Sequence, residues 1–94
     1  MKKELPKFKV GDEVMWSSQA SSFEKVKQGV VVGIVPKGVH VHRGFLVRGT
    51  EHLMKYNKSR LGDGYGRDHE SYLVLVNDKY LYWPRVSQLN LVRV

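Results

Sequence analysis

Hydrophobic and polar residues alternate near the start of the chain with a period of two. Period-two alternation is the pattern of a β-strand that buries one face. Gly11-Asp12 interrupts the run, as a turn or a β-bulge does. We therefore predict a short strand, a tight bend and a longer strand between positions 8 and 16. The residues that share one parity are Phe8, Val10, Val14 and Trp16.

The next two segments differ sharply in composition. Residues 17–27 are polar and rich in serine, and Phe23 and Val26 are their only large apolar side chains. They predict a loop that folds back on the domain through those two residues. Residues 28–35 hold four valines and an isoleucine, which favour a β-strand. Pro36 ends this strand because proline has no N–H to donate to the ladder.

Residues 36–70 give a mixed pattern. Alternation across residues 39–47 predicts a hairpin, and residues 50–56 predict a short helix with Thr50 as its N-cap. Residues 57–68 are polar and contain three glycines at alternate positions, which predicts an exposed loop.

The end of the chain has the clearest pattern. Residues 71–76 and 79–83 predict two strands joined by Asn77-Asp78, both of which tolerate the positive φ of a hairpin turn. Pro84 ends the second strand. Residues 85–89 have the length of one 3₁₀ turn, and residues 90–94 predict a final short strand.

This order of elements resembles the SH3-like barrel. The segment Val10-Gly11-Asp12-x-Val14, followed by Gly29-Val30-Val31-x-Gly33-Ile34, is similar to KOW and Tudor-type modules and to type II dihydrofolate reductase. The resemblance covers residues 8–35 and 71–94. It implies an all-β, five-stranded SH3-like barrel at residues 8–94, with residues 36–70 inserted in the n-Src-type loop and residues 1–7 as a flexible tail.

The resemblance does not extend to reductase activity. That family places a Gln-Ile-Tyr segment before the proline that leads to its last turn, whereas Leu81-Tyr82-Trp83 precede Pro84 here. The glutamine that contacts the ligands is therefore missing. Two segments, 66–74 and 81–85, are also similar to small accessory proteins of tailed bacteriophages, which implies a binder directed at a host factor or at nucleic acid.

Composition narrows the class of protein. The chain has 94 residues, which is one domain, and no cysteine, which fits a reducing compartment. It has no apolar run of membrane-spanning length, and no apolar segment follows its basic first residues as in a signal peptide. We therefore expect a cytoplasmic protein, in the host cytoplasm if a phage encodes it.

Charge suggests the kind of partner. The formal net charge is +7, and a basic chain favours a polyanion. Aromatic residues interleave with the basic ones near the last hairpin, and this combination suits phosphates and bases together. We predict a non-enzymatic module that binds nucleic acid. The candidate residues are Arg43, Arg48, Lys55, Lys58, Arg60, Arg67, Lys79, Tyr80, Tyr82 and Arg85.

The alternative is a protein-interaction module. Apolar anchors within residues 36–70 suit a host protein as partner, or a homo-oligomer, since free sheet edges favour self-pairing. The candidate anchors are Phe45, Leu53, Met54 and Tyr56, together with Leu46.

Metal binding and catalysis have little support in the sequence. The four histidines follow no recognised ligand spacing, although His40 and His42 would share a face of a strand. Residues 67–71 contain an acid, a base and a serine in direct succession, but adjacent loop residues rarely hold catalytic geometry. The sequence therefore predicts no metal, no cofactor and no catalytic residue.

Overall fold

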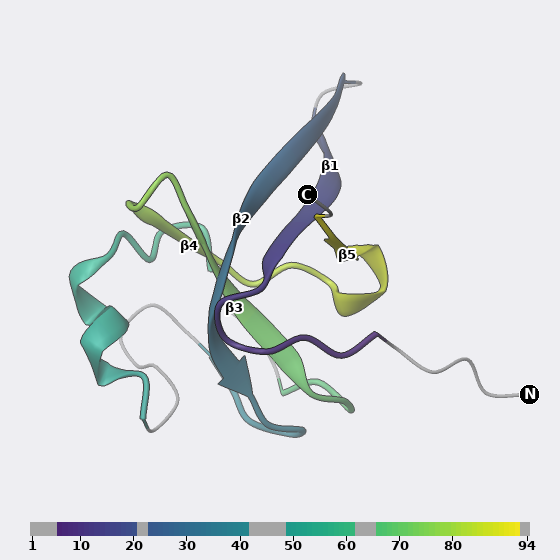
Figure 1. Ribbon diagram of the computed structural model, residues 1–94. Helices are drawn as coiled ribbons and strands as arrows, with labels where there is room; N and C mark the ends of the chain where they lie inside the picture. Colours follow the sequence, from purple (N-terminus) through teal and green to yellow (C-terminus); the bar gives the residue numbers. More distant parts are fainter. Residues whose placement is uncertain (1–5, 21–22, 42–48, 62–65, 93–94) are drawn as a thin grey trace, which may run out of the picture.

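The computed structural model of this protein is an open antiparallel sheet of five strands in the order β4-β3-β2-β1-β5 (Figure 1). It describes residues 6–20, 23–41, 49–61 and 66–92. In this part of the chain the two helical elements are 3₁₀ turns, and no helix is long and apolar enough to cross a membrane. The strands are β1 (Glu13–Ala20), β2 (Phe23–Val35), β3 (Ser71–Val76), β4 (Tyr80–Tyr82) and β5 (Asn90–Leu91). An all-β fold is thus confirmed.

The first hairpin corrects the prediction of a loop at residues 17–27. β1 and β2 pair continuously from Glu13 opposite Val30 to Ala20 opposite Phe23. The far half of this hairpin extends beyond the rest of the sheet (Figure 1), and Val26 there is 62% exposed. A hairpin arm that extends beyond its sheet has no core to face, so its sequence can be as polar as that of a loop. Its backbone groups are satisfied by pairing between the two strands.

The start of the described chain is a turn rather than a strand. Gly11 has a φ of 100° and donates its N–H to the Val31 carbonyl at 2.9 Å. The Val31 N–H in turn donates to the Asp12 carbonyl at 2.9 Å. The predicted strand at Phe8–Val10 is therefore wrong, whereas the predicted bend at Gly11-Asp12 is confirmed.

The second half of the sheet follows the sequence pattern closely. β3 pairs with both β2 and β4, and the β3–β4 turn has the predicted positive φ, 55° at Asn77 and 53° at Asp78. Val76 pairs with Tyr80, so three residues connect the strands rather than the predicted two. The register of β2 against β3 shifts between Val31 and Gly33. After β4, the 3₁₀ turn η2 (Val86–Gln88) leads into β5, which pairs with β1.

The inserted residues contribute to the core. The predicted short helix is the 3₁₀ turn η1 (Glu51–Lys55), and Thr50 precedes it without capping it by its side chain. Val41, Leu53 and Leu61 from this segment are all buried. Residues 42–48 of the predicted hairpin and residues 62–65 of the predicted loop lie outside the described residues.

Two apolar clusters lie on opposite faces of β3, because successive side chains of a strand point to opposite sides. Leu73 and Leu75 join the first cluster, which the insertion covers, and Tyr72 and Val74 join the second. The remaining members of the first cluster are Val35, Val41, Leu53, Leu61, Leu81 and Trp83. Those of the second are Val14, Trp16, Val31, Val86 and Leu89.

The Tyr72 hydroxyl ties the start of the described chain to β3. It accepts a hydrogen bond from the Phe8 N–H at 3.1 Å and donates to the Glu70 carboxylate at 3.0 Å. The two rings meet edge to face, with centroids 5.4 Å apart. Burial raises the pKa of Tyr72, the Phe8 N–H lowers it in part, and Glu70 raises it further.

Replacing Tyr72 with phenylalanine is expected to lower the free energy of unfolding by roughly 1 kcal/mol near pH 7, because the Phe8 N–H loses its acceptor. The raised pKa means that the hydroxyl stabilises the fold in its neutral form. That contribution is complete below the unfolded-state pKa near 10 and is lost as pH rises through the folded-state pKa. Urea unfolding of both proteins between pH 7 and 11 should show the difference narrowing at high pH. A constant difference would contradict this role.

Candidate nucleic-acid interface

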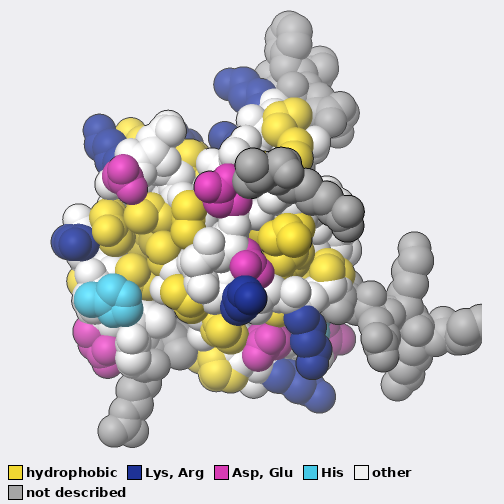
Figure 2. All heavy atoms as spheres, in the orientation of Figure 1, with side chains coloured by type: hydrophobic (Ala, Val, Ile, Leu, Met, Phe, Trp, Pro, Cys, Tyr) yellow, Lys and Arg dark blue, Asp and Glu magenta, His cyan; other side chains and the backbone are white. Residues whose placement is uncertain are grey.

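The lysine and arginine side chains that the structure describes are not neutralised by internal ion pairs. Within the described residues, no lysine or arginine nitrogen lies within 4.0 Å of a carboxylate oxygen, and the one pair present joins His69 to Asp68 at 2.8 Å. Figure 2 shows Lys and Arg side chains spread around one face, with hydrophobic side chains between them. The cations are therefore available to an external anion.

Asn57 brings the insertion to the edge of β4. It forms a parallel bridge with Tyr80: its N–H donates to the Lys79 carbonyl at 2.8 Å, and its carbonyl accepts from the Leu81 N–H at 2.9 Å. Asparagine in a polar segment gave no indication of pairing with a strand, so sequence reasoning missed this bridge. Because of this bridge, Arg60, three residues further along the chain, lies next to β4.

Two of the predicted cations lie beside the Tyr80 ring. The Lys79 Nζ lies 5.3 Å from the ring centroid and the Arg60 guanidinium carbon 5.8 Å from it. Tyr80 is half-buried, so part of the ring stays accessible. A cation beside a ring is the combination that contacts phosphate and base together.

Tyr82 lies two residues further along β4, on the same face of the sheet as Tyr80. Its ring meets Trp16 edge to face at 5.6 Å, and the Lys27 Nζ lies 5.1 Å from the Tyr82 centroid. Lys27 was not among the predicted site residues, because residues 17–27 gave the pattern of a loop rather than of a strand beside Tyr82. We call Lys27, Arg60, Lys79, Tyr80 and Tyr82 the basic–aromatic stripe.

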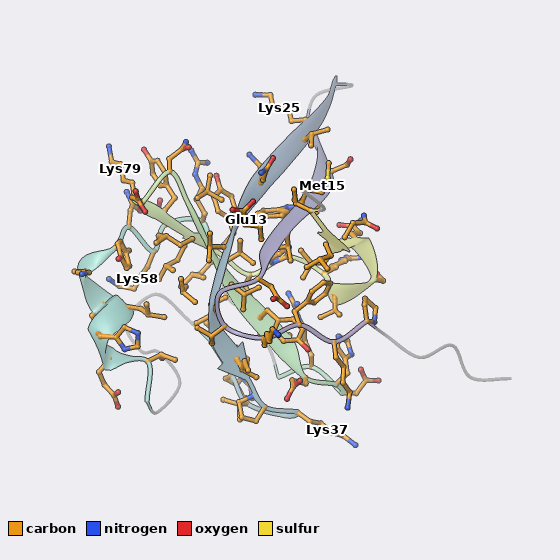
Figure 3. The ribbon with its side chains drawn as sticks, viewed as in Figure 1. Glu13, Met15, Lys25, Lys37, Lys58 and Lys79 are labelled. Atoms are coloured by element: carbon orange, nitrogen blue, oxygen red, sulfur yellow. The ribbon has the colours of Figure 1, made fainter. Side chains whose placement is uncertain are left out.

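Two more predicted cations, Lys55 and Lys58, lie on the inserted segment. The Lys55 Nζ lies 5.1 Å from the centroid of the half-buried Tyr56 ring. Lys58 donates to the Met54 carbonyl at 2.5 Å and to the Tyr56 carbonyl at 3.1 Å. Lys58 therefore stabilises the end of η1, where its charge meets backbone carbonyl oxygens. Figure 3 places Lys58 and Lys79 on the same side of the molecule.

Arg67 and Arg85 form a separate site beyond the C-terminal end of β4. The half-buried Arg67 guanidinium stacks over the Trp83 ring at 3.9 Å and donates to the Trp83 carbonyl at 2.8 Å and the Pro84 carbonyl at 2.7 Å. Burial lowers the pKa of Arg67, and the nearby charge of Arg85 lowers it further. Arg67 thus helps to hold the chain after β4.

The predicted protein-interaction anchors are placed very differently from one another. Leu53 is only 2% exposed and belongs to the first core cluster, so its prediction as a surface anchor is corrected. The helix prediction alone did not say which face of η1 meets the sheet. Met54 is 42% exposed, and Tyr56 is half-buried against the same cluster. Phe45, Leu46, Arg43 and Arg48 lie outside the described residues.

The large aromatic side chains divide between core and surface. Trp16, Tyr72 and Trp83 are buried, and the half-buried Tyr80 and Tyr82 remain for a ligand. In the described ranges, no three histidine or carboxylate side chains come together as a metal site would require.

Comparison with known proteins adds no relative to this description. No protein-family model matches the chain, and no curated protein or solved structure is significantly similar to it. The site must therefore be interpreted from its own geometry.

Proposed function

We propose that this protein is a non-enzymatic module that binds nucleic acid through the basic–aromatic stripe. The observation that carries the proposal is the set of cations beside two partly accessible tyrosine rings, with no carboxylate of the described residues paired to them. Stacking requires bases that are not enclosed in a duplex. We therefore favour a single strand or an unpaired region, with phosphates on Lys27, Arg60 and Lys79 and bases on Tyr80 and Tyr82.

We also propose that the sheet is the frame of an SH3-like barrel. Two features support this. The strand order β4-β3-β2-β1-β5, with a 3₁₀ turn between β4 and β5, follows the arrangement that the resemblance implies. Residues 36–70 connect β2 to β3, which is the position of the n-Src-type loop. The stripe would then lie on the last hairpin and the adjoining first hairpin, beside this loop.

Binding should depend on salt in proportion to the number of phosphates contacted. Three contacts to a single strand predict a log–log slope of about −2, or roughly a 20-fold weaker affinity at 200 mM than at 50 mM salt. Lys79→Glu and Arg60→Glu should each remove one contact, lowering affinity about fivefold near 100 mM and reducing the slope by about 0.7. Fluorescence anisotropy with labelled single-stranded DNA and RNA measures both quantities.

The matched control is Lys9→Glu, which makes the same charge change at an exposed residue far from the stripe in sequence. An equal loss of affinity in Lys9→Glu would show that only net charge matters. Absence of binding to single-stranded and double-stranded probes at 50 mM salt would contradict the proposal. The protein-interaction alternative would then rest on the exposed Met54 and on Tyr56.

A further inference from the structure

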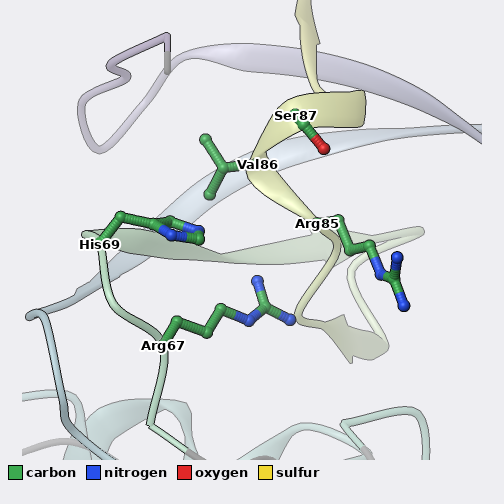
Figure 4. Close-up of a pocket in the computed structure, with 5 residues that line it drawn as sticks. All are labelled: Arg67, His69, Arg85, Val86 and Ser87. Atoms are coloured by element: carbon green, nitrogen blue, oxygen red, sulfur yellow. The ribbon is translucent and has the colours of Figure 1, made fainter. Parts of the chain in front are cut away.

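A second cationic site lies apart from the stripe, in a cavity of about 260 Å³. Arg67, His69, Arg85, Val86 and Ser87 line it (Figure 4). These residues come from the segment before β3 and from the turn after β4, which are far apart in sequence. At about 30 Å³ for each water molecule, the cavity has room for roughly nine waters. It is therefore large enough for a small anion with an attached organic group.

The charge in this cavity is not balanced from within the described protein. Arg67 is half-buried beside Arg85, and neither has a carboxylate within ion-pair distance. The nearest acid in sequence, Asp68, accepts a hydrogen bond from the His69 Nδ1 at 2.8 Å. That bond and the charge of His69 lower the pKa of Asp68. Two like charges next to each other favour the binding of an anion that satisfies both.

The cavity keeps hydrogen-bond donors that suit an oxyanion. Arg67 has five N–H donors, of which one on each terminal nitrogen donates to the Trp83 or Pro84 carbonyl. The other N–H groups are left for a ligand. Arg85 and Ser87 line the cavity from the segment after β4, and Figure 4 shows the Arg67 guanidinium lying between the His69 ring and Arg85.

We propose that this cavity binds a phosphate monoester or inorganic phosphate, held by Arg67 and Arg85 with the Ser87 hydroxyl as an added donor. Two guanidinium charges match a phosphate dianion, and arginine is the side chain best suited to hydrogen-bond its oxygens. The source is either the phosphorylated end of a strand or a small phosphorylated molecule. The site does not depend on nucleic-acid binding by the basic–aromatic stripe.

The test is a two-dimensional amide NMR titration at constant ionic strength. The probes are inorganic phosphate, a 5′-phosphorylated trinucleotide and its unphosphorylated counterpart. We expect saturable shifts at Arg85, Val86 and Ser87 with both phosphorylated probes, at a dissociation constant of about 1 mM or tighter. Arg85→Gln should weaken binding at least tenfold, since Arg85 is exposed and its loss should leave the fold intact. Lys79→Gln, on the stripe, is the matched control and should leave the affinity unchanged.

The proposal is overturned if neither phosphorylated probe gives saturable shifts at the cavity up to about 10 mM, or if Arg85→Gln binds as tightly as the unaltered protein. Tighter binding of the phosphorylated trinucleotide assigns the site to a strand end. Equal binding of inorganic phosphate assigns it to a small molecule. If Lys79→Glu no longer binds a long single strand but keeps these shifts, the two sites are separate. If a long strand binds but the phosphorylated probes give no shifts at the cavity, only the stripe remains.

Discussion

Replacing Trp83 with alanine is expected to lower the free energy of unfolding by about 3–5 kcal/mol. Trp83 is 7% exposed and belongs to the first core cluster, so truncation leaves a large cavity. Its Nε1–H donates to the hydroxyl of Ser71, which is fully buried, at 2.8 Å. The substitution also removes the ring under the Arg67 guanidinium. Chemical denaturation followed by circular dichroism measures the loss.

Trp83→Phe is the matched control for this prediction. It keeps an aromatic ring in the core and under Arg67 but removes the indole N–H, so the loss should be smaller than in Trp83→Ala. A loss below about 1 kcal/mol in Trp83→Ala would mean that the ring is not packed as described. In that case the Trp83 ring would not hold Arg67 as described, and the proposed phosphate site would lose its support.

Replacing Leu53 with alanine is expected to lower the free energy of unfolding by about 2–5 kcal/mol. Leu53 projects from η1 into the first core cluster and is 2% exposed. Its Cδ1 would lie 3.4 Å from a Cβ added at Gly33, which shows how closely η1 approaches β2. The neighbouring Met54 is 42% exposed, and Met54→Ala should change stability by no more than about 0.5 kcal/mol. Urea unfolding of both variants provides the comparison.

The two alanine variants together decide what the insertion does. If Leu53→Ala and Met54→Ala both leave stability unchanged, η1 is not packed on the sheet and Leu53 returns as a candidate surface anchor. If only Leu53→Ala destabilises the protein, residues 36–70 are part of the core. The insertion then has two roles, because the same segment that covers Leu73 and Leu81 also carries Arg60 to the Tyr80 ring.

The stripe runs along β4, and the proposed phosphate cavity lies beyond the C-terminal end of this strand. Tyr80 and its cations follow the β3–β4 turn, and Arg85 follows Pro84 after the strand ends. Of the ten predicted nucleic-acid residues, the eight that the structure describes therefore do not form one surface. Lys79, Tyr80, Tyr82 and Arg60 are in the stripe, and Lys55 and Lys58 are on the inserted segment near Tyr56. Arg67 and Arg85 line the cavity, and Arg43 and Arg48 lie outside the described residues.

The sequence by itself determined the elements whose signal is local. The β-branched and aromatic run at Ser71–Val76, the positive-φ residues Asn77 and Asp78, and the prolines at 36 and 84 each act through the backbone of their own segment. Strand period and turn chemistry depend on neighbours a few residues away. These elements could therefore be predicted, and the structure agrees with them.

Only the tertiary structure decided the features that depend on contacts between residues far apart in the sequence. The arm at residues 17–27 forms strands because its two halves pair with each other, although its polar side chains predict a loop. Leu53 is buried and Met54 exposed because of where η1 meets the sheet. Asn57 beside Tyr80, Lys27 over Tyr82 and Arg67 over Trp83 each join residues more than fifteen positions apart. No local pattern encodes such contacts, since burial and pairing are properties of the assembled sheet.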